Sequence, residues 1–147
     1  MKILIDADGC PVVDLTVRMA KENDIECLIL CDTSHVFEKD GAVTMTFDKG
    51  ADRVDFALVN RVLAGDIVIT QDYGLAAMCL SKHAVVLNQD GMEYTGDNIN
   101  SLLLARYTAQ KIRRSGGRLK GPKKRTTLQD QKFKEKLACL LEDGRTM

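Results

Sequence analysis

The feature of this chain that most constrains its fold is a regular alternation of short apolar runs with longer segments of helical periodicity. Short runs bounded by charged or turn residues are typical of buried strands, whereas apolar residues three or four positions apart indicate a helix. We expect strands at 2–6, 26–31, 42–47, 67–70 and 84–87, and helices at 11–23, 50–64, 73–82, 97–114 and 127–142. This order predicts an α/β fold in three layers, with a mostly parallel sheet flanked by helices.

The length of 147 residues suits one domain with a substantial core. Within it we distinguish an α/β body at 1–114 from a basic, glycine-rich loop and C-terminal helix at 115–147, which we expect to pack on the same domain. No apolar run approaches the roughly 20 residues that cross a bilayer. The N-terminal apolar stretch is too short for a secretory signal. We therefore expect a cytoplasmic protein without a membrane partner.

Acidic residues follow several of the predicted strands. Asp6 ends the first strand and Asp8 comes just beyond it, while Asp72 follows the strand at 67–70. Asp52 and Asp55 are three residues apart near the start of the helix after Phe47, so they share a helix face. In a parallel sheet the carboxyl ends of the strands meet at one edge, where the active crevice of such folds lies. These five acids therefore form a candidate site.

Crowded carboxylates repel one another and stay ionised near neutral pH only with a cation among them. Mg²⁺ or Mn²⁺, which take oxygen ligands, suit Asp6, Asp52, Asp55 and Asp72 as the metal-binding set. A divalent ion in an acidic site activates water and clamps phosphate oxygens, so the chemistry that we expect is hydrolysis of a phosphate ester. Helix capping and surface exposure are the structural alternative for each acid taken singly.

The distribution of charge is uneven although the net charge is zero. Residues 1–105 carry 8 Lys and Arg against 17 Asp and Glu, whereas residues 106–136 carry 12 against 2. A basic segment on an acidic body favours an anionic partner, and a glycine-interrupted loop can follow the phosphates of RNA or DNA. A solvated linker is the alternative interpretation. The candidate nucleic-acid-binding residues are Arg113, Arg114, Arg118, Lys120, Lys123, Lys124 and Arg125.

Several motifs resemble those of the bacterial YaiI/YqxD family along nearly the whole chain. They are Asp6-Ala7-Asp8-Gly9-Cys10-Pro11-Val12, Gly50-Ala51-Asp52-Arg53-Val54-Asp55, Gly65-Asp66-Ile67-Val68-Ile69-Thr70-Gln71-Asp72, Leu87-Asn88 with Gly91, Tyr94, Asn98-Ile99, Gly116-Gly117 and Gly121-Pro122. The family brings no established activity with it.

The fold of the YaiI/YqxD family is similar to the PIN domain of metal-dependent nucleases. PIN domains place acids after the first strand, in a middle helix and after a later strand. Asp6, Asp52 or Asp55, and Asp72 match those positions, and Asp8 and Asp66 are further candidates. The resemblance implies a Mg²⁺- or Mn²⁺-dependent nuclease. The first motif departs from the PIN pattern by holding two acids and a Cys-Pro pair, which leaves open a changed substrate or a lost activity.

Two other classes of function remain open. The opening Ile3-Leu4-Ile5-Asp6-Ala7-Asp8-Gly9 looks like the motif of haloacid-dehalogenase-type phosphatases, in which Asp6 would be the nucleophile and Asp8 the general acid. Against this reading, Cys10 stands where that motif has a threonine. The other class is a non-catalytic nucleic-acid-binding protein. The five cysteines show no C-x-x-C spacing, which favours buried thiols, and only Cys10 is placed for a catalytic role.

Overall fold

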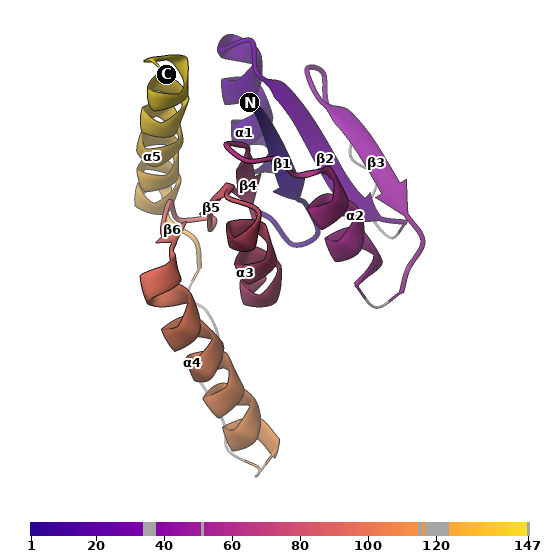
Figure 1. The fold of residues 1–147 in the computed structure, drawn as a ribbon, viewed down its shortest axis with the longest axis vertical. Coiled ribbons are helices and arrows are strands. Elements are labelled where there is room, and N and C mark those ends of the chain that lie inside the picture. The colour runs from indigo at the N-terminus through magenta and orange to yellow at the C-terminus, as the bar shows by residue number, and fades with distance from the viewer. Residues whose placement is uncertain (34–37, 51, 115, 117–123, 147) are drawn as a thin grey trace.

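The computed structural model describes residues 1–33, 38–50, 52–114, 116 and 124–146, and the side chains of these residues up to 144. It contains a six-stranded sheet in the order β3-β2-β1-β4-β5-β6 (Figure 1). The strands are β1 (Lys2–Asp6), β2 (Glu26–Asp32), β3 (Val43–Phe47), β4 (Ile67–Ile69), β5 (Val85–Leu87) and β6 (Glu93–Tyr94). All neighbouring pairs are parallel except β5 with β6.

Helices cover both faces of this sheet. They are α1 (Val13–Glu22), α2 (Arg53–Arg61), α3 (Tyr73–Ser81), α4 (Gly96–Arg114) and α5 (Thr127–Thr146). The predicted three-layer α/β fold with a mostly parallel sheet is therefore confirmed, and every predicted element is present with ends shifted by a few residues. The predicted helix at 50–64 is shorter because Asp52 adopts a left-handed φ of 62° before it and Val62 is extended after it.

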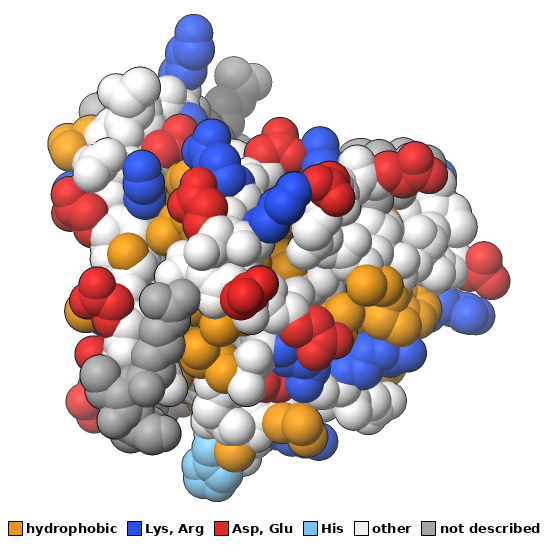
Figure 2. Space-filling model, turned by 90° about the horizontal axis from the view of Figure 1, so that it is seen from above, with side chains coloured by type: hydrophobic (Ala, Val, Ile, Leu, Met, Phe, Trp, Pro, Cys, Tyr) orange, Lys and Arg blue, Asp and Glu red, His pale blue; other side chains and the backbone are white. Residues whose placement is uncertain are grey.

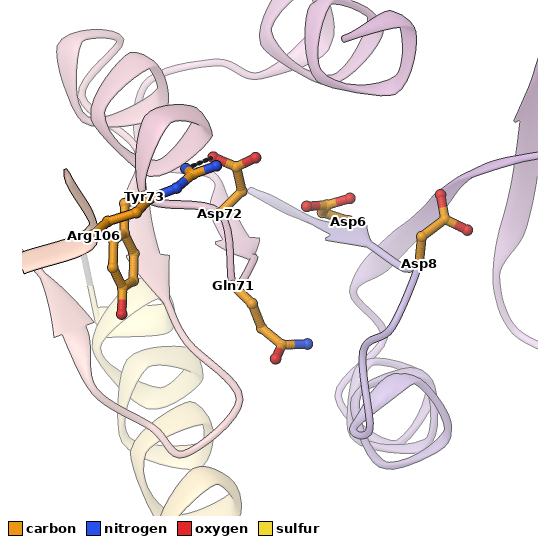
Figure 3. A pocket seen from close by; sticks show the side chains of 6 residues that line it. All are labelled: Asp6, Asp8, Gln71, Asp72, Tyr73 and Arg106. Carbon is orange, nitrogen blue, oxygen red and sulfur yellow. Dashed lines mark ion pairs between the residues drawn. The ribbon is translucent and has the colours of Figure 1, made fainter. Parts of the chain in front are cut away.

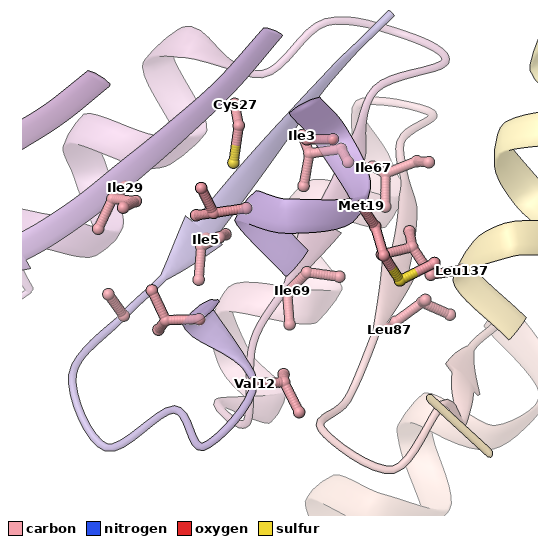
Figure 4. Close-up of a cluster of buried hydrophobic side chains, with 14 of the residues drawn as sticks. Ile3, Ile5, Val12, Met19, Cys27, Ile29, Ile67, Ile69, Leu87 and Leu137 are labelled. Carbon is pink, nitrogen blue, oxygen red and sulfur yellow. The ribbon is translucent and has the colours of Figure 1, made fainter. Parts of the chain in front are cut away.

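Alternation along the strands divides the core into two halves. Ile3 and Ile5 of β1 face α1 and α5, whereas Leu4 faces α2 and α3. Figure 4 shows the first half, in which apolar side chains of the inner strands meet Met19 of α1 and Leu137 of α5. Because the inner strands are buried on both faces, their sequences are continuous apolar runs, as is usual for parallel sheets.

The C-terminal helix packs on the same core as the body. Phe133, Leu137 and Leu141 of α5 are at most 1% exposed and join the cluster around β1. The turn at Gly91 fits closely beneath this helix. Gly91 has a φ of +83°, and a Cβ there would lie 2.8 Å from the carbonyl oxygen of Lys132. Only glycine satisfies both the left-handed backbone and this close approach.

The order of the strands reverses between β1 and β4. From β1 the chain moves outward to β2 and β3, then returns to place β4 on the other side of β1. Such a switch point leaves a crevice beyond the carboxyl ends of the two strands, where ligands of α/β proteins bind. The opposite end of the sheet, viewed in Figure 2, carries Lys and Arg interspersed with Asp and Glu. The fold thus directs attention to the rim formed by β1 and β4.

Candidate active site at the carboxyl rim of the sheet

Thr70 joins the two strand ends at the switch point. Its side chain is buried, and its hydroxyl donates a hydrogen bond of 2.8 Å to Oδ2 of Asp6. The hydroxyl oxygen of Thr70 in turn accepts the backbone N–H of Asp72 at 3.0 Å. Asp6 at the end of β1 and Asp72 after β4 are therefore held in a fixed relation by one residue between them.

Asp72 has two partners within the protein. Its Oδ1 accepts the backbone N–H of Leu75 at 3.1 Å, so Asp72 is the N-cap of α3. Nη1 of Arg106, on α4, lies 3.7 Å from the same oxygen. The capping alternative raised from the sequence is thus correct for Asp72, and it coexists with a place in the pocket. Figure 3 shows the carboxylates of Asp72, Asp6 and Asp8 following one another along the rim.

The loop after β1 is tied to both of its neighbours. Oδ2 of Asp8 accepts the backbone N–H of Asp32 at the end of β2, at 3.0 Å. On the other side, Nε2 of Gln71 donates to the carbonyl oxygen of Gly9 at 2.8 Å. These contacts enclose a pocket of about 320 Å³, which we call the acidic pocket; it is lined by Asp6, Asp8, Gln71, Asp72, Tyr73 and Arg106 (Figure 3).

A second hollow of about 460 Å³ adjoins the acidic pocket on the side of α2. Asp72 and Arg106 line both hollows, and Asp52 and Asp55 line the second. Asp55 in the first turn of α2 is half-buried, while Asp52, just before that helix, is exposed. The structure therefore brings all five predicted acids to two adjoining hollows at one rim.

Burial and nearby negative charges raise the pKa values of Asp6 and Asp55. The pKa of Asp6 rises from 3.8 to about 6, mainly because its carboxyl group is buried. The hydrogen bond from Thr70 lowers this pKa, whereas the charges of Asp55, Asp72 and Asp8 raise it further. Burial and the charges of Asp72 and Asp52 also raise the pKa of Asp55. Ionisation of Asp6 is therefore less favourable in the metal-free protein than in an exposed aspartate.

The donor atoms of this rim suit a hard cation. They are carboxylate oxygens from Asp6, Asp8 and Asp72 and the side-chain amide of Gln71. Burial raises the pKa of the nearby Cys10 to about 11, so this residue is a neutral thiol and not an activated nucleophile. Among the residues that the structure describes, no three His, Cys, Asp or Glu side chains form a ready-made metal site. The carboxylates line the hollows without meeting at one point.

The predicted basic residues divide into three groups. Arg113 and Arg114 lie exposed in the last turn of α4, and Lys124 is exposed before α5. Arg118, Lys120 and Lys123 lie outside the described residues. Arg125 bonds to Asp90 and Asp130, both at 2.7 Å, and to the carbonyl oxygen of Gln89 at 2.6 Å. Its guanidinium therefore fastens the start of α5 to the turn before β6.

Asp66 does not belong to the site, which corrects the sequence analysis. It precedes β4, so it lies at the amino end of the sheet, and its carboxylate is 2.6 Å from Nζ of Lys2 at the start of β1. It also accepts the backbone N–H groups of Lys2 and Leu63. Asp66 is only 3% exposed, and these bonds satisfy it within the protein.

Residues that the sequence analysis did not select complete the site. Arg106 is the positively charged side chain that lines both hollows. Thr70 positions Asp6 and Asp72 through its hydroxyl group. Thr70 and Gln71 could have been found from the sequence, because they directly precede Asp72 at the carboxyl end of a predicted strand. Arg106 had no comparable signal, because the docking of α4 beside α3 does not follow from helical periodicity.

The fold and site together define a three-layer α/β protein with an acidic crevice at the switch point of its sheet. The chain belongs to the YaiI/YqxD family: the family model described as "Uncharacterized BCR, YaiI/YqxD family" matches residues 4–143. The resemblance inferred from the motifs is therefore confirmed. No solved structure matches this chain.

Relatives extend over the whole length of the chain. A UPF0178 protein of Exiguobacterium sibiricum is 52% identical over 97% of this chain and 98% of its own. UPF0178 proteins of Clostridium kluyveri and Clostridium acetobutylicum are 45% and 44% identical, each over 99% of this chain and 95% and 99% of their own. Within the described part of the chain, no helix is long and apolar enough to cross a membrane.

Proposed function

We propose that this protein is a Mg²⁺- or Mn²⁺-dependent nuclease that hydrolyses phosphodiester bonds of RNA or DNA. The observation that carries the proposal is the grouping of Asp6, Asp55 and Asp72 around Arg106 at the switch point. Acids that repel one another beside an arginine suit a metal ion and an ionic substrate. The PIN-like pattern of the acids supports the same proposal.

Burial is the main cause of the raised pKa values of Asp6 and Asp55, and repulsion from neighbouring acids adds to it; a bound cation would offset both effects. Asp6, Asp55 and Asp72 would hold it, with Asp52 at the edge of the second hollow. When bound there, the ion supplies Lewis-acid chemistry, polarising water and phosphate oxygens. The oxygen-rich donor set matches Mg²⁺ and Mn²⁺ rather than a metal that requires sulfur or imidazole.

The chain's own groups supply the remaining steps. Thr70 orients the carboxylate of Asp6, and the backbone of Asp32 orients that of Asp8. Asp8 accepts a proton from the attacking water as general base. Arg106 lines both hollows, and its forked guanidinium stabilises the negative charge that grows on the phosphate oxygens in the transition state.

The phosphatase alternative requires Asp8 to act as a general acid and Asp6 as a covalent nucleophile. Oδ2 of Asp8 already accepts the backbone N–H of Asp32, which fixes this oxygen at the rim. The cation that lines the acidic pocket is an arginine, Arg106, with an open groove beyond it. An open groove favours a polymer over a small phosphate ester.

The test is cleavage of end-labelled single-stranded RNA and DNA in Mn²⁺ and in EDTA. We expect cleavage in Mn²⁺ that is abolished by EDTA and by the double substitution Asp6→Asn with Asp72→Asn. Glu22→Gln, which removes an exposed acid at the end of α1, is the matched control and should cleave as wild type. Equal cleavage by wild type and the double variant would contradict the proposal. Metal-independent binding without turnover would favour the non-catalytic alternative.

A further inference from the structure

A groove runs from the acidic pocket along α4. It has a volume of about 420 Å³ and is lined by Tyr73, Ala105, Arg106, Ala109, Gln110 and Arg113. Tyr73 and Arg106 also line the acidic pocket. The groove and the pocket therefore share a wall, and a ligand that occupies one can continue into the other.

The charge of the groove distinguishes it from the other side of the pocket. Toward α2 the hollow presents Asp52 and Asp55 together with apolar side chains such as Phe56. Along α4 the charged side chains of the groove are two arginines, Arg106 and Arg113, with the amide of Gln110 between them. A polyanion that enters the acidic pocket is repelled on the α2 side and attracted on the α4 side.

The spacing of these polar residues follows the helix. Arg106, Gln110 and Arg113 stand at positions i, i+4 and i+7, so they lie on one face of α4. Seven residues correspond to about 10.5 Å along a helix axis. A stacked strand advances about 3.4 Å per nucleotide, so this face spans about three nucleotides.

Tyr73 supplies an aromatic surface at the junction of pocket and groove. Its half-buried ring meets the ring of Tyr94 edge-on, with centroids 6.0 Å apart and planes at 64°. Tyr94 is buried, and its hydroxyl donates to the carbonyl oxygen of Thr70 at 3.2 Å. The ring of Tyr73 is therefore held in place by the same strand end that positions Asp6.

We propose that this groove binds single-stranded nucleic acid, with phosphates on Arg106 and Arg113 and a base stacked on Tyr73. This inference deepens the proposed nuclease function and rests on it for the direction in which the strand enters the acidic pocket. Only an unstacked base can stack on an aromatic side chain, and the bases of a duplex are already paired and stacked on one another. The groove thus selects a single strand over a duplex, for ribose and deoxyribose alike.

The experiment measures binding without cleavage. Fluorescence anisotropy in EDTA would follow a labelled 12-nucleotide single strand, its abasic counterpart and a duplex of the same length, each over a range of NaCl concentrations. Arg113→Ala is matched by Lys111→Ala, which removes the same charge from the same helix about 160° away from Arg113. Tyr73→Leu is matched by Tyr107→Leu, which makes the same change at a tyrosine of α4 that is exposed and outside the groove.

We expect Arg113→Ala to weaken binding of the single strand and of its abasic form, and to reduce the slope of log K against log salt concentration by about 0.7. Lys111→Ala should leave that slope unchanged. Tyr73→Leu should weaken binding of the base-containing single strand about tenfold, without affecting the abasic strand or the duplex. Tyr107→Leu should bind as wild type.

Equal losses in Arg113→Ala and Lys111→Ala would overturn the inference, because they would indicate attraction to the general charge of the helix. So would a wild-type protein that does not bind the single strand. Arg113 is exposed, so this pair of variants decides the matter even where Tyr73→Leu fails to fold. If wild type binds as expected in EDTA but does not cleave in Mn²⁺, the nuclease proposal is refuted and the binding groove stands. If wild type cleaves but the matched variants bind equally well, the groove is refuted and the nuclease proposal stands.

Discussion

Asp6→Asn should make the metal-free protein more stable at neutral pH while abolishing the proposed nuclease activity. The carboxylate of Asp6 is buried among other acids, and its pKa rises from 3.8 to about 6. The folded protein therefore binds a proton at Asp6 more tightly than the unfolded chain does. Stability from this residue is fully present below about pH 4 and is lost as the pH rises through 6.

The magnitude follows from the size of that rise. At about 1.4 kcal/mol for each pKa unit, the ionised side chain destabilises the fold by about 3 kcal/mol above pH 7. Asparagine has no charge to desolvate, and its amide oxygen can still accept the hydrogen bond from Thr70. For a domain of this size a gain of about 3 kcal/mol corresponds to a rise of about 6–12 °C in Tm.

The assay is thermal and urea unfolding of wild type and Asp6→Asn in EDTA, between pH 4.5 and pH 8. We expect the variant to be more stable by about 3 kcal/mol at pH 8 and by only about 1 kcal/mol at pH 4.5. Added Mn²⁺ should stabilise wild type by about 2.7 kcal/mol at a hundredfold excess over its Kd and leave the variant unchanged. A variant that is less stable than wild type at every pH would refute the reasoning, because it would show that Asp6 has no buried charge to relieve.

Three further predictions concern the surroundings of the site. Thr70→Val removes the hydrogen bond that lowers the pKa of Asp6, so carbon-13 NMR should record a higher pKa for this carboxyl; an unchanged value would contradict the role of Thr70. Gly91→Ala, at a positive φ against α5, should destabilise the protein by about 1–3 kcal/mol in urea, and an unchanged midpoint would be the opposite result. Arg125→Ala should lower the unfolding free energy by about 1 kcal/mol and leave oligonucleotide affinity unchanged, whereas lost affinity at full stability would make this residue a ligand contact.

The sequence sufficed for the order of the elements because each inner strand is an apolar run between charged or turn residues. It did not suffice for β6, since Glu93–Tyr94 has two residues and forms no pattern. Helix ends were also less well predicted. Pro11 was expected in the first turn of its helix, but α1 begins two residues later at Val13. A two-residue strand exists only because β5 is already in place to pair with it.

The acidic site could be predicted because parallel strands end at one rim, which makes proximity a consequence of topology. The same rule should have excluded Asp66, which precedes its strand instead of following it. Arg106 could not have been found in this way. Its place beside Asp72 depends on how α4 packs against α3, and the sequence of α4 does not specify that packing.

The nucleic-acid-binding prediction was drawn from charge alone, and charge does not distinguish ligand contacts from internal ion pairs. Arg125 illustrates the limit, because both of its acidic partners, Asp90 and Asp130, are distant or unremarkable in the sequence. Arg113 and Arg114 are equivalent in the sequence. Of the two, only Arg113 lines the groove along α4, and this difference is visible only in the structure.

The most direct test of the whole account is anomalous diffraction from crystals of the protein soaked in Mn²⁺. We predict a single strong manganese peak within about 2.5 Å of carboxylate oxygens from Asp6 and Asp72, with Asp55 turned toward it. A fully occupied crystal with no peak at this rim, or with manganese bound only elsewhere, would contradict the claim that these carboxylates exist to hold a metal.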